Sequence, residues 1–299
     1  MTRIVSSAPG SLMLLGEHAV LRGHACLVAA INRRVSVTIS TREDGMVNIA
    51  SALGSFSTPR RETGDHPSFR FVLACLRYVH HAFANGCDIE IHADMPATIG
   101  FGTSAAVTVA VLAALSGETD KARLMREARA IIQQVQGRGS GADVAASVYG
   151  GVVRYRMQND AAELISRDPH PVAALYCGYK TPTPEVIARV DERWRNDPKS
   201  RDAIFSRMGE LADQGIDHSF GERLNEGQTL MMSLGVSTPE LDQCVEILRA
   251  SPGISGAKIS GSGLGDCAIG WGELNDNIDL PETFSAYNLN VEPMGVRFE

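Results

Sequence analysis

The amino-acid sequence predicts an α+β protein of two domains that share a cleft. Two observations carry this prediction. A glycine-rich stretch at residues 95–106 runs directly into an apolar helical stretch at 107–115, and strands and helices follow again over residues 172–270. Because the composition turns polar between these parts, we expect an N-terminal domain over residues 1–160 and a C-terminal domain over residues 161–299.

Composition and charge exclude several classes of protein. The chain has 299 residues, 44% of them hydrophobic, and a net charge of −7, which gives no electrostatic footprint for a nucleic-acid partner. The apolar runs are shorter than the roughly 18 residues of a membrane span, and the first residues lack the apolar stretch of a secretory signal. We therefore expect a soluble, cytoplasmic protein with no membrane partner. Six scattered cysteines predict reduced, mostly buried thiols.

The first half predicts alternating strands and helices around the glycine loops. Period-two alternation indicates strands, and longer runs with helical spacing indicate helices. The expected strands are 4–8, 35–39, 88–92 and 152–155, and the expected helices are 69–83, 107–115, 121–136 and 144–149. We expect Pro9-Gly10 to turn the first strand, and residues 45–63, with Arg60 and Arg61, to form a solvated hairpin or loop.

Two polar residues follow the buried run Leu12–Leu15. At Glu17 and His18 we expect the chain to leave the buried interior and to enter a polar environment. A carboxylate beside an imidazole suits the recognition of substrate hydroxyls. The alternative is that both side chains satisfy buried backbone groups.

The glycine-rich stretch favours phosphate as a ligand. Pro96, Gly100 and Gly102 forbid a regular element there, so a loop feeds the N-terminus of the following helix. Unpaired N–H groups and the helix dipole attract an anion, and the hydroxyls of Thr103 and Ser104 could add a Mg²⁺ ligand. The alternative is a tight turn before a core helix, and the loop fits neither the P-loop nor the dinucleotide fingerprint.

A second glycine loop, residues 137–141, precedes Asp143. Three glycines in five residues let the backbone bend closely around a ligand. Asp143 at the start of the next helix is either an N-cap or a carboxylate that accepts a proton from, or orients, a substrate hydroxyl.

The second half predicts a further strand, four helices and a third glycine loop. Residues 158–171 indicate a polar connection. The expected strand is 172–177 and the expected helices are 184–196, 200–215, 224–234 and 239–250. Strand-like residues flank the glycine loop within residues 254–270, so we expect this half to contribute that loop to the cleft.

Three ordered glycine motifs, at residues 9–20, 96–106 and 257–265, resemble those of the GHMP kinase family, which is named for galactokinase, homoserine kinase, mevalonate kinase and phosphomevalonate kinase. Residues 16–23, 224–228 and 234–237 are most similar to mevalonate kinases, whereas residues 139–144 and 265–267 are similar to phosphomevalonate kinases. The resemblance covers nearly the whole chain.

The resemblance implies a fold and an activity. The N-terminal domain would be like that of ribosomal protein S5, the C-terminal domain ferredoxin-like, with ATP and Mg²⁺ in the cleft between them. The reaction would move the γ-phosphoryl group of ATP onto an alcohol of mevalonate in isoprenoid precursor synthesis. The alternatives are a phosphomevalonate kinase, which takes a phosphorylated small-molecule acceptor, another GHMP kinase, and a decarboxylase relative that phosphorylates and then eliminates. A regulatory homologue that binds nucleotide or metabolite without turnover is the non-enzyme alternative, and the oligomeric state stays open, a homodimer included.

The resemblance also implies roles for single residues. Asp143 would be the catalytic carboxylate, Ser104 a metal ligand, and Glu17, His18 and Lys180 would lie toward the substrate. The residues expected to bind the nucleotide are Pro96, Gly100, Gly102, Thr103, Ser104, Ala105, Gly261, Ser262 and Gly263.

The chain departs from mevalonate kinases at two positions. Those enzymes usually carry a lysine where Ser11 stands and a Mg²⁺-binding glutamate where Ile132 stands. Phosphoryl transfer needs positive charge, so the candidates for the absent lysine are Arg138, Lys180 and Lys258. We favour Arg138 as a catalytic residue because it shares the glycine loop of Asp143. The alternative is a solvated loop charge.

Overall fold

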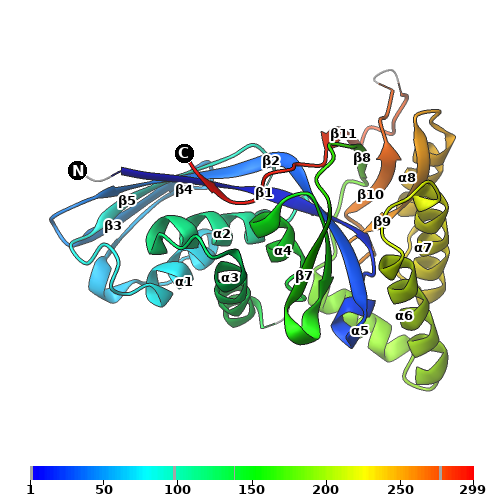
Figure 1. Ribbon diagram of the computed structural model, residues 1–299, viewed down its shortest axis with the longest axis horizontal. Helices are drawn as coiled ribbons and strands as arrows, with labels where there is room; N and C mark the ends of the chain where they lie inside the picture. Colours follow the sequence, from blue (N-terminus) through cyan, green and yellow to red (C-terminus); the bar gives the residue numbers. More distant parts are fainter. Residues whose placement is uncertain (1–2, 97–98, 138, 276–277) are drawn as a thin grey trace.

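The computed structural model describes residues 3–96, 99–137, 139–275 and 278–299. They form two β-sheets with helices packed on them (Figure 1). In the eight-stranded sheet the order is β12-β1-β2-β5-β3-β4, with β6 paired to β2 and β7 paired to β6. These strands are β1 (Arg3–Leu15), β2 (Ala25–Thr41), β3 (Met46–Ser51), β4 (Gly54–Pro59), β5 (Cys87–Ala93), β6 (Val152–Arg156), β7 (Ala161–Ser166) and β12 (Arg297–Phe298).

The four-stranded sheet has the order β11-β8-β10-β9 and is antiparallel throughout. Its strands are β8 (Pro171–Tyr176), β9 (Ile254–Ser260), β10 (Cys267–Gly272) and β11 (Ser285–Asn290). The mixed α+β architecture that the sequence predicts is confirmed. The division at residues 160 and 161 stays a prediction, although β7 and β12 both join the large sheet.

The helices pack on the two sheets. In Figure 1 the first four lie below the large sheet and the last two lie beside the small one, while the sixth also packs against β1 and β2. They are α1 (Arg70–Tyr78), α2 (Thr103–Ser116), α3 (Lys121–Gln136), α4 (Ala142–Tyr149), α5 (Thr183–Arg193), α6 (Pro198–Asp213), α7 (Phe220–Leu234) and α8 (Pro239–Ala250). The predicted bounds of α3 and α8 are confirmed to the residue.

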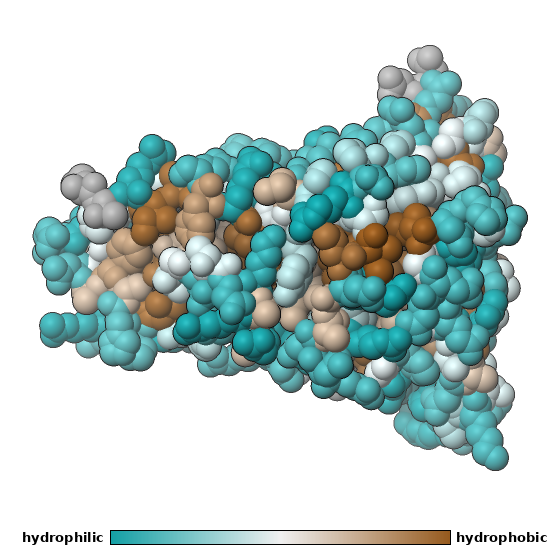
Figure 2. All heavy atoms as spheres, in the orientation of Figure 1, coloured by the Kyte–Doolittle hydropathy of each residue, from teal (hydrophilic) through white to brown (hydrophobic). Residues whose placement is uncertain are grey.

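The face of the molecule drawn in Figure 2 is mainly hydrophilic. Within the described ranges, no helix has both the length and the apolar character needed to cross a membrane.

The inner strands of the small sheet, β8 and β10, are buried on both faces. Because side chains alternate along a strand, Val172 and Ala174 of β8 join the core of the large sheet, while Ala173 and Leu175 join the core under α5–α8. Ile269 of β10 follows the first pattern, and its neighbour Ala268 follows the second. The core of the large sheet is therefore built from both halves of the chain, and the small sheet separates it from the second core.

The predicted turn at Pro9-Gly10 is wrong. The strand β1 runs without a break, and its register against β2 shifts between Pro9, opposite Arg34, and Gly10, opposite Ile31, so the extra residues lie in β2. Proline lacks an N–H donor, and the irregular pairing at this point accommodates it inside the strand.

Three further expectations need correction. The polar connection at residues 158–171 contains β7, an edge strand with few buried side chains, which is why its hydrophobic pattern is weak. The helix expected to reach residue 83 ends at Tyr78. Arg60, expected in solvent, is buried there and donates to the carbonyls of Val79, His80 and Ala82, which lie beyond the helix. All six cysteines are buried and free, as predicted.

Candidate active site

The first glycine motif (residues 9–20) packs against the second (residues 96–106). The N–H of Ser11 donates to the carbonyl of Phe101 at 2.9 Å, and the hydroxyl of Ser147 in α4 holds the carbonyl of Pro9 at 2.8 Å. A Cβ on Gly102 would lie 2.0 Å from the Ser11 hydroxyl, so only glycine fits at this approach. The loop at residues 99–102 is therefore packed directly on Ser11.

Asp143 lies in the first turn of α4 and points at Ser11. Gly141, in the left-handed conformation, is the N-cap, and no side chain caps this helix, so the interpretation of Asp143 as an N-cap is wrong. Its Oδ1 instead accepts a hydrogen bond from the Ser11 hydroxyl at 2.7 Å. Burial raises the pKa of Asp143, and the Ser11 hydrogen bond and the charge of Lys180 oppose that rise.

The N-terminus of α2 has the features expected of a phosphate site. Gly102 is the N-cap in the left-handed conformation, and no side chain caps the helix. The Thr103 hydroxyl is buried and has no hydrogen-bond partner among the residues that the structure describes. Such an orphaned polar atom beside uncapped N–H groups fits an anion with a hard cation.

The other residues predicted to bind the nucleotide differ in their burial and in their contacts. Ser104 is half-buried beside Thr103, and Pro96 is exposed at the start of the loop. Ala105 is buried and already donates its N–H to the carbonyl of Gly102 at 3.0 Å. The Ser262 carbonyl lies 2.9 Å from Nε2 of His18, so the third glycine motif (residues 257–265) contacts the first (residues 9–20).

Lys180 and Asp266 complete the site on the side of the small sheet. Lys180 Nζ pairs with Oδ2 of Asp266 at 2.8 Å, and Oδ1 of Asp266 accepts the N–H of Gly100, also at 2.8 Å. A Cβ on Gly100 would lie 2.2 Å from Asp266 Oδ2. Asp266 is not among the site residues that the sequence predicts; its only signal is an acidic residue directly after the third glycine motif.

Glu17 has a partner of its own. It forms an ion pair with Lys258, and the two side chains are 3% and 1% exposed. Lys258 also donates to the carbonyl of Ile259. Both groups are thus engaged with each other inside the molecule, and a contact of Glu17 with substrate stays a prediction.

A cavity of about 290 Å³ adjoins the glycine loop that precedes Asp143 (residues 137–141). Its walls include His18, Gln133, Gly139 and Phe205. Burial lowers the pKa of His18, so its imidazole favours the neutral form. The charged lining residues Arg22 and Asp191 pair with each other at 2.5 Å. The cavity combines polar and apolar walls and has room for a small hydroxy acid. Arg138, next to Gly139, lies outside the described residues.

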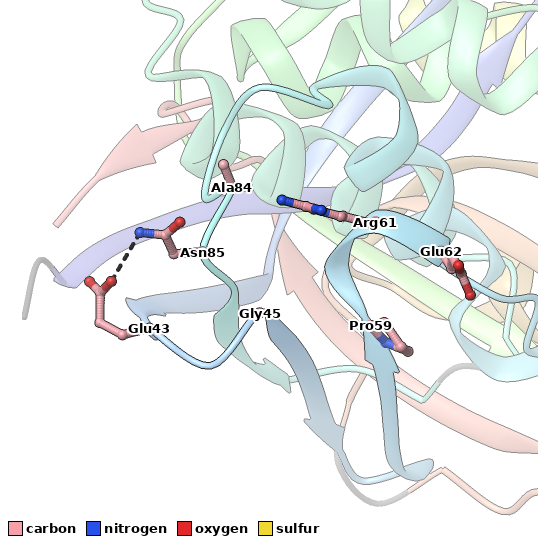
Figure 3. A pocket seen from close by; sticks show the side chains of 7 residues that line it. All are labelled: Glu43, Gly45, Pro59, Arg61, Glu62, Ala84 and Asn85. Atoms are coloured by element: carbon pink, nitrogen blue, oxygen red, sulfur yellow. Dashed lines mark hydrogen bonds between the residues drawn. The ribbon is translucent and has the colours of Figure 1, made fainter.

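A larger cavity, about 450 Å³, lies at the β3–β4 hairpin (Figure 3). Its walls come from Glu43, Gly45, Pro59, Arg61, Glu62, Ala84 and Asn85. No glycine-loop residue that the structure describes lines this cavity. We therefore do not assign it as the active site, although it is larger than the cavity beside His18.

Two family models match separate parts of the chain. Residues 70–151 match the family model for the GHMP kinases N terminal domain, and residues 210–281 match the model for GHMP kinases C terminal. Residues 2–41 also match the galactokinase galactose-binding signature. The mevalonate kinase of Archaeoglobus fulgidus is 34% identical, with 89% of this chain and 92% of the relative covered. The chain belongs to the GHMP kinase family.

Other GHMP kinases give a consistent result. The mevalonate kinase of Methanothermobacter thermautotrophicus is 32% identical, with 88% of each chain covered. The solved structure of the Methanococcus jannaschii mevalonate kinase superposes with a TM-score of 0.81 at 21% identity, covering 97% of this chain and 98% of that chain. At this identity the superposition shows a shared fold, the two-domain GHMP kinase fold expected from the sequence.

Two of the three candidate cations lie within the described residues. Lys258 is engaged with Glu17, whereas the charge of Lys180 lowers the pKa of Asp143. Lys180 follows β8 and pairs with Asp266. Arg138, favoured by its proximity to Asp143 along the chain, lies outside the described residues, so its catalytic role stays a prediction.

Proposed function

We propose that this GHMP kinase transfers the γ-phosphoryl group of ATP to the alcohol of mevalonate. The enzyme class follows from the family, and the names of its relatives support mevalonate as the acceptor. The observation that carries the proposal is the Asp143 carboxylate held by Ser11 against the glycine loop at residues 99–102. A carboxylate at this place can take the proton of an alcohol as phosphoryl transfer begins.

Each group has a role in this proposal. Gly100, Gly102, Thr103 and Ser104 bind the nucleotide phosphates, with Gly261, Ser262 and Gly263 covering them. The hydroxyl of Ser104, with the orphaned Thr103 hydroxyl, would hold Mg²⁺, which neutralises charge on the β- and γ-phosphates when bound. Lys180 supplies further positive charge. His18 contacts the acceptor from the wall of the smaller cavity.

The environment of Asp143 suits a general base. A base is most effective when its pKa lies near the working pH, and burial shifts the pKa of this carboxyl upward in that direction. The Ser11 hydroxyl, which donates to Oδ1, fixes the carboxylate orientation. Most of the catalysis would come from positioning and charge neutralisation, as in other phosphoryl transfers.

An acceptor panel tests the proposal. ADP release is followed with ATP, Mg²⁺ and one of mevalonate, phosphomevalonate, galactose or homoserine, and the phosphorylated product is identified by mass spectrometry. We expect mevalonate to give the highest kcat/KM and the Asp143→Asn protein, as the matched control, to be nearly inactive. Faster turnover of another acceptor would replace mevalonate in the proposal. Tight ATP binding without ADP release for any acceptor would favour a regulatory homologue.

A further inference from the structure

Asp266 uses its two carboxylate oxygens for different partners. Oδ1 accepts the N–H of Gly100 and the thiol of Cys267, and Oδ2 pairs with the ammonium of Lys180. The Asp266 side chain is 13% exposed, whereas that of Lys180 is 40% exposed. One half-buried carboxylate thus connects the loop that precedes α2 with a cation that remains open to solvent.

The backbone around Asp266 is shaped to present this carboxylate. Leu264, Gly265 and Asp266 have φ angles of 55°, 120° and 77°, a conformation that side-chain-bearing residues seldom adopt. The Asp266 N–H donates to the carbonyl of Tyr179 at 2.7 Å, and its carbonyl accepts the N–H of Cys177 at 3.0 Å. The residue before Lys180 is therefore hydrogen-bonded to Asp266 through the backbone, in addition to the side-chain ion pair.

The contacts of Asp266 lie next to those of the catalytic carboxylate. Gly100 binds Asp266, and the adjacent Phe101 carbonyl binds the N–H of Ser11, whose hydroxyl binds Asp143. Two carboxylates are thus anchored on neighbouring residues of one loop. The charges of both Lys180 and Asp266 act on Asp143, in opposite directions.

We propose that Asp266 is a positioning residue that holds the Lys180 ammonium beside Asp143 and the nucleotide loop. Without the Asp266 charge, the long lysine side chain would spread over its rotamers in solvent and would spend little time at the site. This inference rests on the proposed kinase function for its kinetic consequence, but the link between the two side chains is independent of any acceptor.

The substrate-independent test is chemical labelling of lysine in the full-length protein. Asp266→Asn keeps an oxygen that can accept the Gly100 N–H, and asparagine tolerates a positive φ, so the variant removes the charge with little change to the loop. We expect acetic anhydride, read by mass spectrometry, to label Lys180 several-fold faster in Asp266→Asn than in the wild type. Labelling of Lys199, on α6, is the internal reference. An unchanged rate at Lys180 would overturn the proposal.

The kinetic test is a double-mutant cycle of Asp266→Asn and Lys180→Met. If Asp266 acts through Lys180, the single Asp266→Asn change lowers kcat about tenfold, Lys180→Met lowers it by about 10², and the double variant is no slower than Lys180→Met alone. Multiplied effects, or a wild-type kcat in Asp266→Asn, would overturn the positioning role.

Two controls separate this role from others. Lys180→Arg should recover part of the activity only while Asp266 is present, and a merely structural contact would change the melting temperature without this dependence. If the wild type turns over no acceptor, the proposed function fails, and the labelling result still decides the link between Asp266 and Lys180.

Discussion

Two lysine–carboxylate pairs differ in their access to solvent. Glu17 and Lys258 join the first half of the chain to the second, whereas Lys180 and Asp266 both lie in the second half and contact the first through the N–H of Gly100. Glu17 and Lys258 are 3% and 1% exposed, while Lys180 is 40% exposed over an Asp266 that is 13% exposed. We call Glu17–Lys258 the sealed pair. It lies between β9 and the segment after β1, where neither charge can reach a ligand without leaving the core. We call Lys180–Asp266 the open pair, and it borders the glycine loop at Gly100.

The difference teaches that a charged residue in a motif need not be a ligand-binding residue. Glu17 lies in the first glycine motif, yet its observed partner is a buried lysine. Asp266 lies just after the third motif, yet it touches both the glycine loop at Gly100 and the exposed Lys180. Solvent access, set by the tertiary structure, separates a group that stabilises the fold from a group that can act on a substrate.

The largest effect on activity should come from a change at Asp143, the carboxylate on which the charges of the open pair act. Asp143→Asn keeps the shape of the side chain and its contact with Ser11 but removes the charge and most of the basicity. We expect kcat to fall by roughly two to four powers of ten, measured by ADP release at saturating substrates. A variant with more than half of the wild-type rate would remove Asp143 from the mechanism.

The sealed pair should show its effect in stability. Lys258→Met leaves Glu17 buried without a partner, which we expect to lower the free energy of unfolding by roughly 3–5 kcal/mol in urea titrations. Adding Glu17→Met should recover much of this loss, because two apolar side chains then replace two buried charges. Equal stability of Lys258→Met and the wild type would mean that the pair is not sealed.

The open pair should show the reverse behaviour. Lys180→Met is expected to lower kcat by about 10² while changing the free energy of unfolding by less than about 1 kcal/mol, because exposed ion pairs contribute little to stability. Arg138→Gln is the matched control. If the arginine change alone lowers kcat, Arg138 is the working cation and the assignment of Lys180 is wrong.

The smallest effect concerns pH and stability. Since burial raises the pKa of Asp143, the folded state prefers its protonated form, and stability is lost as the pH rises from the unfolded pKa through the folded one. Asn mimics the protonated acid, so Asp143→Asn should melt at a higher temperature than the wild type at pH 7. The gap should close at pH values below the unfolded pKa. Melting curves across this range would show an opposite sign if the carboxylate were stabilised in the fold.

The parts of the fold that local sequence determines could be predicted well. The helix α3 was predicted to the residue because Asp120 caps it by accepting the N–H groups of Ala122 and Arg123, and Gly137 ends it. The helix α8 has a similar signal, because the hydroxyl of Thr238 caps it directly before a proline.

The features that escaped prediction depend on contacts between distant segments. Nothing local distinguishes a Pro-Gly turn from a Pro-Gly pair inside a strand, and β1 continues through Pro9 because β2 pairs with both sides of it. Arg60 is buried because carbonyls past α1 accept its hydrogen bonds. Likewise, the contacts of Asp266 with Lys180 and with the N–H of Gly100 join segments far apart in the sequence, so they appear only in the folded structure.

The small sheet, whose inner strands are apolar on both faces, has a consequence for cooperativity. Alternate residues of β8 and β10 belong to different cores, so neither core can lose its packing while the strands between them stay ordered. The two halves should therefore melt together as one thermodynamic unit, and calorimetry should record a single transition whose calorimetric and van't Hoff enthalpies agree. Nucleotide binding in the cleft would then raise the stability of the entire molecule, far beyond the loops that touch the ligand.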